Sequence, residues 1–392
     1  MIDSSAVTNL EFQLTDDQRA IRELARDFAE TELKPHRSEW DETQEFPLEA
    51  FRKMGDLGFL GTLMPTELGG AGLGATENAI IIEEIARVDP AVALSIAAHN
   101  GLCSSHIYRF GSEALRQKYI PALARGEVLG AWGLTEPSAG SDAGGTRTVA
   151  QKDGDAYILN GSKNFITHGT VGKTAVIMAV TDAAKGTRGI SAFALDKSMP
   201  GFHASKKENK VGMRCSDTSS LVLENVRVPK ENLIGTEGEG FVQALQILDG
   251  GRISIAALSV GTAQGAFEAA IHYAQVREQF GKPISQQQST QFKLAQMAMK
   301  IEAARLLTMK AAWLRDNGQP FSKAASMAKL FASETSVSVA EESVQIHGGY
   351  GYIKEYPVEK FWRDSKLLTI GEGTSEVQRM VIARKLMEEY SA

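Results

Sequence analysis

The stretch Gly133-Leu134-Thr135-Glu136-Pro137-Ser138-Ala139-Gly140-Ser141-Asp142 marks the point at which the character of this sequence changes. Upstream of it, apolar residues recur mainly at helical spacing, and downstream of it short β-rich runs follow one another. Hydroxyl groups and glycines are dense in the stretch, which suits a loop that wraps a polar, phosphate-bearing ligand through backbone N–H groups. A polar β-turn loop without a ligand explains the same residues equally well.

The chain upstream of this loop has the pattern of an α-helical domain. Thr15-Asp16-Asp17-Gln18 is a capping box, and apolar residues follow it at helical spacing as far as Pro35. The glycine-rich segment 64–72 lacks the GxxxxGK[ST] spacing of a phosphate loop, so we expect a turn there. Residues 1–127 therefore form the first predicted domain, with further helices expected at 48–57, 76–87, 90–110 and 112–124.

The chain downstream of the loop is rich in short β runs. Turns such as Asn160-Gly161 are expected to separate the strands. No helical crossover lies between the runs, and Gly140 and Gly144 do not form a GxGxxG turn, so a dinucleotide-binding Rossmann sheet is not supported. We expect a small antiparallel β-barrel or sandwich domain over 128–234, with strands in 157–159, 175–180, 190–195 and 220–228.

Helices dominate again from Gly240 onward. The predicted helices are long, at 241–279, 287–317 and 322–346, and helices of this length are typical of a bundle. The fold class is therefore a multidomain α+β protein, with an N-terminal α-helical domain, a central β domain, and a C-terminal four-helix bundle over 235–392.

Composition excludes several classes of function. The chain has 392 residues, 43% of them hydrophobic, and a net charge of −6 without a Lys/Arg block, which argues against nucleic-acid binding. Cys103 and Cys215 are its two cysteines, so a reducing compartment is expected, and the histidines lack metal-ligand spacing. No apolar run is long enough to span a membrane, and no signal or transit peptide precedes the first helix. These features suit a bacterial cytoplasm, although a processed protein of the mitochondrial matrix looks the same.

The segment 370–379 carries the candidate catalytic group. Glu372 lies between Gly371 and Gly373, just before a helix predicted from the apolar spacing that begins at Val377. A carboxylate on a glycine-flanked turn is placed by the backbone, next to N–H groups that can hold a carbonyl oxygen, which suits a general base. The alternative is a solvated turn residue that interacts favourably with the helix dipole.

Six motifs follow one another along the chain: 134–142, Asn160 to Thr167, Gly212 to Ser216, Arg277 to Gly281, Gln345 to Gly351, and Glu372-Gly373-Thr374. Taken in this order and spacing, they resemble the acyl-CoA dehydrogenase family over nearly the whole chain. The resemblance implies an α–β–α architecture, a homotetramer, and FAD in a cleft between the β domain and the C-terminal helices.

The resemblance also implies which residues contact FAD. Within one subunit, the flavin or its pyrophosphate would be contacted by Trp132, Leu134, Thr135, Gly140 and Ser141. Phe165 and Thr167 would cover one face of the flavin. Thr374 and Glu376 would reach the ADP part. A neighbouring subunit would supply Arg277, Gln279, Phe280, Gln288, Gln345, Gly348 and Gly349, although Arg277 could instead help to hold the dimer.

For the substrate, the resemblance makes Glu372 the base. Another branch of the family carries its base at the position that is Gly251 here, so Glu372 remains the only candidate. Residues implied near the acyl-CoA are Ser141, Asp249, Arg252 and Gly373, although Asp249 and Arg252 could be a structural ion pair. No metal site is implied.

The implied reaction is desaturation of an acyl-CoA to the trans-2-enoyl-CoA, within fatty acid or amino acid catabolism. Glu372 would remove the α proton, while its N–H and a ribityl hydroxyl of FAD bind the thioester oxygen. The β hydrogen would pass as hydride to flavin N5, and the electrons to an electron-transfer flavoprotein. The expected acyl group is short or branched and monocarboxylic, because the 95–110 helix shows no Arg or Lys placed to bind a second carboxylate, except Arg109.

One departure from the family pattern concerns the acyl pocket. Many members have Tyr before the base, where this chain has Gly371, which would open space for branched, cyclic or aryl chains unless a neighbouring side chain refills it. Rival functions are an acyl-CoA oxidase, a flavin-dependent monooxygenase of the same fold, and a non-enzymatic CoA-binding or scaffold protein. Oxidases usually have an additional C-terminal helical domain, which a chain ending at Ala392 lacks.

Overall fold

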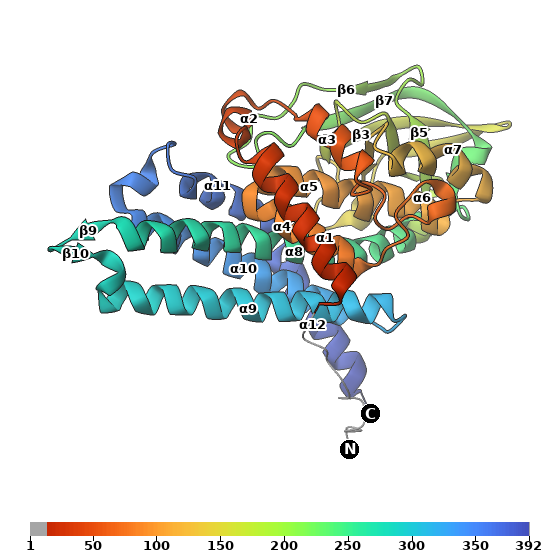
Figure 1. The fold of residues 1–392 in the computed structure, drawn as a ribbon. Coiled ribbons are helices and arrows are strands. Elements are labelled where there is room, and N and C mark those ends of the chain that lie inside the picture. The colour runs from red at the N-terminus through yellow and green to blue at the C-terminus, as the bar shows by residue number, and fades with distance from the viewer. Residues whose placement is uncertain (1–13, 392) are drawn as a thin grey trace.

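The computed structural model describes residues 14–391 as a helical region, a β-sheet region and a second helical region, in that order along the chain (Figure 1). The first helix, α1 (Asp16–Phe28), begins at the predicted capping box, in which the Gln18 N–H donates to Thr15 Oγ1 at 3.2 Å. The other helices of this region are α2 (Arg37–Thr43), α3 (Leu48–Asp56), α4 (Ala75–Val88), α5 (Pro90–Ala98), α6 (Ser105–Phe110) and α7 (Glu113–Ala124).

The helix predicted over 90–110 is interrupted. A π-helical segment, His99–Ser104, separates α5 from α6. Apolar periodicity does not reveal such a segment because all of its residues are buried, as are their neighbours in α5. A π-helical turn inside an α-helix is frequent at functional sites, and this one lies beside the candidate base, as described below.

The sheet region is a sandwich-like sheet whose path does not close into a barrel. The strands are β1 (Gly130–Gly133), β2 (Val149–Asp153), β3 (Ala156–Thr167), β4 (Thr174–Val180), β5 (Ile190–Asp196), β6 (Phe202–Ala204), β7 (Thr218–Pro229) and β8 (Leu233–Ile234). Their order is β6-β7-β3-β2-β4-β5-β8, with β1 paired to β4. The prediction of antiparallel pairing was wrong at two places, since β1 and β2 both pair with β4 in parallel. Parallel pairs need a long connection, and the β2–β3 hairpin lies within the connection from β1 to β4.

The turn expected at Asn160-Gly161 is not a turn. Both residues lie inside β3, where the register against β7 shifts between Leu159 and Gly161. A Cβ at Gly161 would lie 2.5 Å from Thr148 Oγ1, so the glycine admits a close backbone approach at an irregularity in the pairing. The hairpin turn lies instead at Gly154-Asp155, between the paired residues Asp153 and Ala156.

The second helical region is built on three long helices, α8 (Gly240–Val276), α9 (Gln288–Asp316) and α10 (Ser322–His347). Their shared core is rich in alanine, which lets the helices approach closely. A small hairpin, β9 (Glu278–Gln279) and β10 (Lys282–Pro283), joins α8 to α9 at the far left of Figure 1, and α11 (Val358–Leu368) and α12 (Ser375–Tyr390) complete the region. No helix within residues 14–391 is long and apolar enough to cross a membrane.

Candidate active site

Glu372 occupies a strained loop between α11 and α12. Glu372 has φ +53° and Gly373 has φ +94°, so two successive residues adopt left-handed backbone angles, which is unusual for glutamate. Thr374 ends the loop as the N-cap of α12, its hydroxyl accepting the Val377 N–H at 3.3 Å. Within residues 14–391 the Glu372 N–H donates no hydrogen bond. A free N–H beside the carboxylate is what a bound thioester oxygen requires.

The Glu372 carboxylate points at the centre of α8. A Cβ placed on Gly251 would lie 2.1 Å from Glu372 Oε2 and 3.2 Å from Leu102 Cδ2, so no larger residue fits there without displacing the carboxylate. Leu102 belongs to the π-helical segment, which therefore forms one wall of the space around the base. Position 251 and the carboxylate of Glu372 therefore face the same point.

The environment of Glu372 favours its neutral form. Burial raises the pKa of Glu372 to about 7, while the positive charges of Lys329 and Arg252 act in the opposite direction. Its Oε2 atom is buried and has no hydrogen-bond partner among the described residues. A buried carboxylate oxygen without a partner is costly, and such atoms concentrate where a ligand or a catalytic step needs them.

Asp249 and Arg252 lie together on α8, and the charge of Arg252 acts on Glu372. They form an ion pair, and Arg252 also donates to Ser326 Oγ at 3.3 Å. The Arg252 guanidinium is buried, and its Nε has no partner within the described chain. The structure therefore shows the ion pair foreseen as the structural alternative, while an unused donor remains beside the base.

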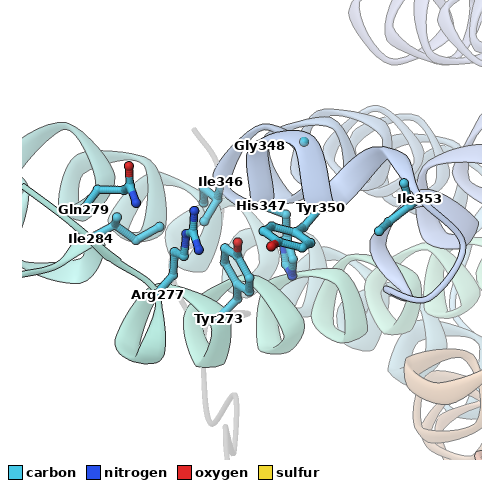
Figure 2. Close-up of a pocket in the computed structure, with 10 residues that line it drawn as sticks. Tyr273, Arg277, Gln279, Ile284, Ile346, His347, Gly348, Tyr350 and Ile353 are labelled. Atoms are coloured by element: carbon cyan, nitrogen blue, oxygen red, sulfur yellow. The ribbon is translucent and has the colours of Figure 1, made fainter.

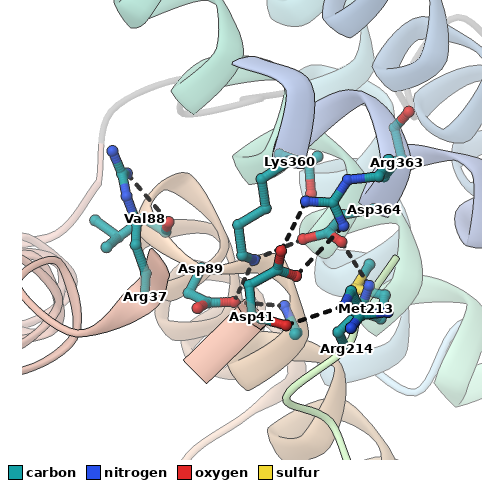
Figure 3. A network of polar contacts seen from close by, with 12 residues as sticks. Arg37, Asp41, Val88, Asp89, Met213, Arg214, Lys360, Arg363 and Asp364 are labelled. Atoms are coloured by element: carbon teal, nitrogen blue, oxygen red, sulfur yellow. Dashed lines mark hydrogen bonds and ion pairs between the residues drawn. The ribbon is translucent and has the colours of Figure 1, made fainter. Parts of the chain in front are cut away.

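A buried polar network fixes the helix that leads into the base loop (Figure 3). Lys360 of α11 pairs with Asp89 at 3.0 Å and with Asp364 at 2.7 Å, and Asp364 accepts the Met213 N–H. Burial disfavours the charged lysine, but the two carboxylates outweigh it and raise the Lys360 pKa. Because Asp89 precedes α5 and Met213 lies between β6 and β7, the network joins all three regions of the fold at α11.

The loop that opens the sheet region is held by a second buried ion pair. Lys163 Nζ lies 2.6 Å from Glu136 Oε1, and the Glu136 carboxylate also accepts the N–H groups of Arg147 and Thr148 at 2.7 and 3.0 Å. Burial lowers the pKa of Lys163 to about 8, against the attraction of Glu136. The loop is therefore anchored at Glu136, while Gly140 and Ser141 remain exposed at its end.

The predicted flavin residues of the sheet region lie close together. Leu134 and Thr135 follow β1 directly, and the Thr135 carbonyl accepts the Asn164 N–H of β3 at 2.8 Å. Phe165, with φ +58°, leaves 69% of its side chain exposed, and Thr167 ends the same strand. We call Trp132, Leu134, Thr135, Gly140, Ser141, Phe165 and Thr167 the sheet cluster.

Trp132 is oriented by a chain of hydrogen bonds. Its indole N–H donates to His106 Nδ1 at 3.0 Å, and His106 Nε2 lies 3.1 Å from Gln243 Oε1. Burial lowers the pKa of His106 to about 4, so the imidazole is neutral, and the indole donor fixes its tautomer. Trp132 also packs against Leu102 and Ile247 in a small apolar cluster, which connects the sheet cluster to the base.

The remaining predicted cofactor residues lie elsewhere. Figure 2 shows a pocket of about 550 Å³ at the other end of α8, where Arg277 lies 5.3 Å from the ring of Tyr350 and Tyr273 stacks on His347. Gly348 and Gly349 leave open space beside their backbone. We call the predicted residues here the distal cluster: Arg277, Gln279, Phe280, Gln288, Gln345, Gly348 and Gly349.

The sheet cluster and the distal cluster are too far apart to contact one ligand within one chain. The helix α8 has 37 residues, so its axis is about 55 Å long, and the distal cluster begins at its C-terminal end. Along that axis Arg277 lies about 35–40 Å from Arg252. The side chain of Phe280 at the hairpin tip is 95% exposed, as expected of a residue that has its contacts outside its own chain.

Sequence reasoning missed Lys329 and Gln378, both of which contact the base loop. Lys329 Nζ donates to the Gly373 carbonyl at 2.7 Å, and Gln378 Nε2 donates to the same oxygen at 2.9 Å. A signal for Lys329 was available, since it follows Ala325 by four residues and precedes Ala332 by three, on the buried face of α10. A lysine at a core position of a helix indicates a special role.

The sheet cluster fits a flavin by its residue types. An exposed aromatic ring, hydroxyl groups and a glycine with no atom within 4 Å of its added Cβ provide stacking surface and open backbone for an isoalloxazine and a pyrophosphate. Neither the sheet cluster nor the base loop offers a metal site, and the described residues contain no group of His, Cys, Asp and Glu able to hold a metal ion.

Comparison with known proteins shows the family to which the chain is similar along its length. Models of the N-terminal, middle and C-terminal domains of acyl-CoA dehydrogenase match residues 15–127, 131–226 and 238–387. The short-chain specific acyl-CoA dehydrogenase of Clostridium acetobutylicum is 47% identical over 96% of this chain and all of that protein.

Two solved structures have the same fold. The butyryl-CoA dehydrogenase from Megasphaera elsdenii has a TM-score of 0.95 and 44% identity, over 96% of this chain and all of that one. A chain in a structure described as the electron transferring flavoprotein of Acidaminococcus fermentans has a TM-score of 0.95 and 48% identity, with the same coverage. The chain described here therefore belongs to the acyl-CoA dehydrogenase family.

Proposed function

We propose that this acyl-CoA dehydrogenase converts a short or branched acyl-CoA to its trans-2-enoyl-CoA, with Glu372 as the base that takes the α proton. The observation that carries the proposal is the buried, unpartnered Oε2 of Glu372, on a carboxyl group whose pKa is raised to about 7 by burial. A base with that pKa is ionised over half of the time at neutral pH or above, and is stronger than a solvated carboxylate.

The chain's own groups can assist the proton transfer. The α proton of a thioester is far too weakly acidic for a carboxylate in water, so negative charge that develops on the thioester oxygen needs a donor. The Glu372 N–H makes no other hydrogen bond within residues 14–391 and is the donor we assign. The buried apolar side chain of Leu102 beside the carboxylate lowers the local dielectric constant, which strengthens both the hydrogen bond and the base.

The family is FAD-dependent, and we infer that the sheet cluster holds FAD in this chain. FAD supplies the acceptor for the β hydrogen, which leaves as hydride. Phe165 and Trp132 would provide aromatic surface for the flavin ring, while the exposed end of the 134–142 loop would bind the phosphates. Thr374 and Glu376 line a separate pocket together with Lys366.

We infer that a second copy of the chain completes the cofactor site. The distal cluster has an open pocket with a guanidinium group, which suits phosphate recognition, yet α8 keeps it away from the sheet cluster of its own chain. A homotetramer, or a dimer within it, would place the distal cluster of one subunit against the FAD of another. The exposed hairpin tip at Phe280 supports such a contact.

The proposed acyl group follows from Gly371 and from the relatives. A Cβ on Gly371 would lie 3.6 Å from the Leu367 carbonyl and 3.8 Å from Leu367 Cδ1, which are ordinary contacts, and its φ is not in the left-handed region. Glycine is therefore required here neither by the backbone nor by crowding, and the space beside it is available to a branched chain. Two similar proteins are named for short-chain and butyryl substrates.

For the electron acceptor we propose an electron-transfer flavoprotein. The support is the similarity of this chain to one in a structure described as the electron transferring flavoprotein of Acidaminococcus fermentans. An oxidase of the same fold would differ in passing electrons to O₂, and aerobic peroxide production during turnover separates the two.

The test is an anaerobic titration of the purified flavoprotein with a panel of acyl-CoAs, following the oxidised flavin band. Bleaching by isobutyryl-, 2-methylbutyryl-, isovaleryl- or butyryl-CoA supports the proposal and ranks the acyl chain. Glu372→Gln should bind the same thioesters and leave the flavin oxidised, while the exposed control Glu341→Gln should bleach like the wild type. Rapid bleaching in Glu372→Gln would disprove the role of the base, and no bleaching by any thioester would favour the monooxygenase.

A further inference from the structure

Lys329 is a charged residue in the interior of the second helical region. Its side chain is fully buried on α10, among the alanines that pack α10 against α8. The Gly373 carbonyl accepts from its ammonium at 2.7 Å, and no carboxylate lies within ion-pair distance in the described chain. Burying an ammonium without a direct counter-ion is costly, so a lysine retained here needs an explanation.

The contact made by Lys329 lies at the point of the base loop where the backbone is most unusual. The Gly373 carbonyl receives two buried donors, Lys329 Nζ and Gln378 Nε2, which come from different helices. The carbonyl follows directly on the two residues with left-handed φ, Glu372 and Gly373. Fixing this oxygen from α10 and α12 at once fixes the peptide planes on which the carboxylate and the free N–H of Glu372 depend.

Lys329 also belongs to the set of charges around the base. The groups that face it are Glu372 in the loop, Arg252 on α8, Glu334 on its own helix and Glu376 on α12. The last two are exposed, and Arg379 lies 2.5 Å from Glu334. Burial lowers the pKa of Lys329 to about 8, against the attraction of Glu372, so the ammonium remains charged at neutral pH. Arg252 is already paired with Asp249, which leaves Lys329 as the less compensated cation near the base.

We propose that Lys329 is a positioning residue for the base: its ammonium holds the Glu372 loop through the Gly373 carbonyl, and its charge keeps the Glu372 carboxylate ionised. The second part rests on the proposed function of Glu372. A purely structural lysine would affect the stability of the loop, but it would leave the ionisation of Glu372 unchanged.

Three substitutions of Lys329 distinguish its hydrogen bond to the loop from the effect of its charge on Glu372. Lys329→Met removes the donor and the charge, Lys329→Gln keeps a donor without charge, and Lys329→Arg keeps both. Lys323→Met, on the same helix but paired with Glu389 near the surface, is the matched control. One measurement does not depend on turnover: Glu372 in the holoenzyme is labelled with a water-soluble carbodiimide and an amine. The labelled fraction is quantified by peptide mass spectrometry at pH values between 5 and 9.

Because the carbodiimide reacts with the protonated carboxyl group, the pH midpoint of labelling reports the ionisation of Glu372. We expect Lys329→Met and Lys329→Gln to raise that midpoint by about one pH unit, and Lys329→Arg and Lys323→Met to leave it in place. In parallel, kcat/KM of Lys329→Gln should fall by about fivefold at pH 7 and recover by pH 9. Lys329→Gln is the informative variant if Lys329→Met does not fold.

An unchanged labelling midpoint in Lys329→Gln would overturn the proposal, as would a loss of turnover in that variant that is equal at every pH. If the wild type desaturates no thioester, the proposed function fails, yet the labelling midpoints still decide whether Lys329 controls the ionisation of Glu372.

Discussion

Replacing Gly251 by alanine tests whether this glycine is present for the stability of α8 or for the position of the Glu372 carboxylate. Gly251 lies in the middle of α8, where glycine is the less stable choice by about 1 kcal/mol relative to alanine. The tightest constraint on this position is the approach of Glu372, whose Oε2 would lie 2.1 Å from the new Cβ, while Leu102 Cδ2 would lie 3.2 Å from it. Gly251→Ala should therefore damage activity without damaging the fold.

The size of the effect follows from the geometry. Contacts of a Cβ below 3.0 Å do not persist, so the Glu372 carboxylate must move by about 1 Å, or the helix must bend. The carboxylate is the end of a flexible side chain and moves more easily. A misplacement of about 1 Å costs on the order of 100-fold in rate, equivalent to about 2.7 kcal/mol in the activation barrier. The unfolding midpoint should stay the same or rise, because the gain in helix propensity offsets the adjustment near Leu102.

The assay compares kcat/KM and the thermal unfolding midpoint of Gly251→Ala with those of Gly250→Ala. The neighbouring glycine is the matched control because the same gain in helix propensity applies, while its Cβ would meet only the guanidinium end of Arg315, at 2.9 Å. Gly250→Ala should keep kcat/KM within about twofold of the wild type. Wild-type kcat/KM in Gly251→Ala would refute the placement of Glu372, and an equal loss in both variants would attribute the effect to α8 and not to the base.

Three further predictions concern the base, its neighbour and the buried network. For the wild type, kcat/KM should fall tenfold per pH unit below about pH 7, because a protonated Glu372 accepts no proton; a flat profile down to pH 5 would contradict the raised pKa. Gly371→Tyr should lower kcat/KM for branched and cyclic thioesters by tenfold or more relative to butyryl-CoA in a substrate panel, and equal losses for all chains would argue against an open pocket. Lys360→Met leaves Asp89 and Asp364 without a counter-charge and should destabilise the protein by about 3–5 kcal/mol in chemical denaturation; a variant as stable as the wild type would show that the network is dispensable.

Much of the architecture follows from local sequence patterns. The capping box at Thr15 starts α1, and the boundaries of α9 and α10 lie within one or two residues of those predicted from apolar spacing. These features depend on neighbours along the chain, which the sequence displays. The prediction of a turn at Asn160-Gly161 was wrong because it also used only neighbours along the chain. A local turn signal cannot reveal that β7 pairs along the whole of β3 and accommodates the register shift there.

The sequence also offered Glu372 as a candidate base, although the local pattern fits a solvated turn residue as well, and the resemblance to the acyl-CoA dehydrogenase family decided between the two. Its partners were not identifiable from the sequence. Gly251, Leu102 and Lys329 come from three different helices, and no periodicity relates them to Glu372.

The sequence by itself determined the order of the helical and β-rich regions, the residue types of the 134–142 loop, and the presence of Glu372 between two glycines before a helix. Only the tertiary structure decided that α8 brings a glycine under that carboxylate, that α10 brings an ammonium to its loop, and that the same α8 separates the sheet cluster from the distal cluster. The physical reason is that helix and strand patterns arise from interactions a few residues apart, whereas burial, pKa and shared contacts depend on which surfaces pack together once the chain is folded.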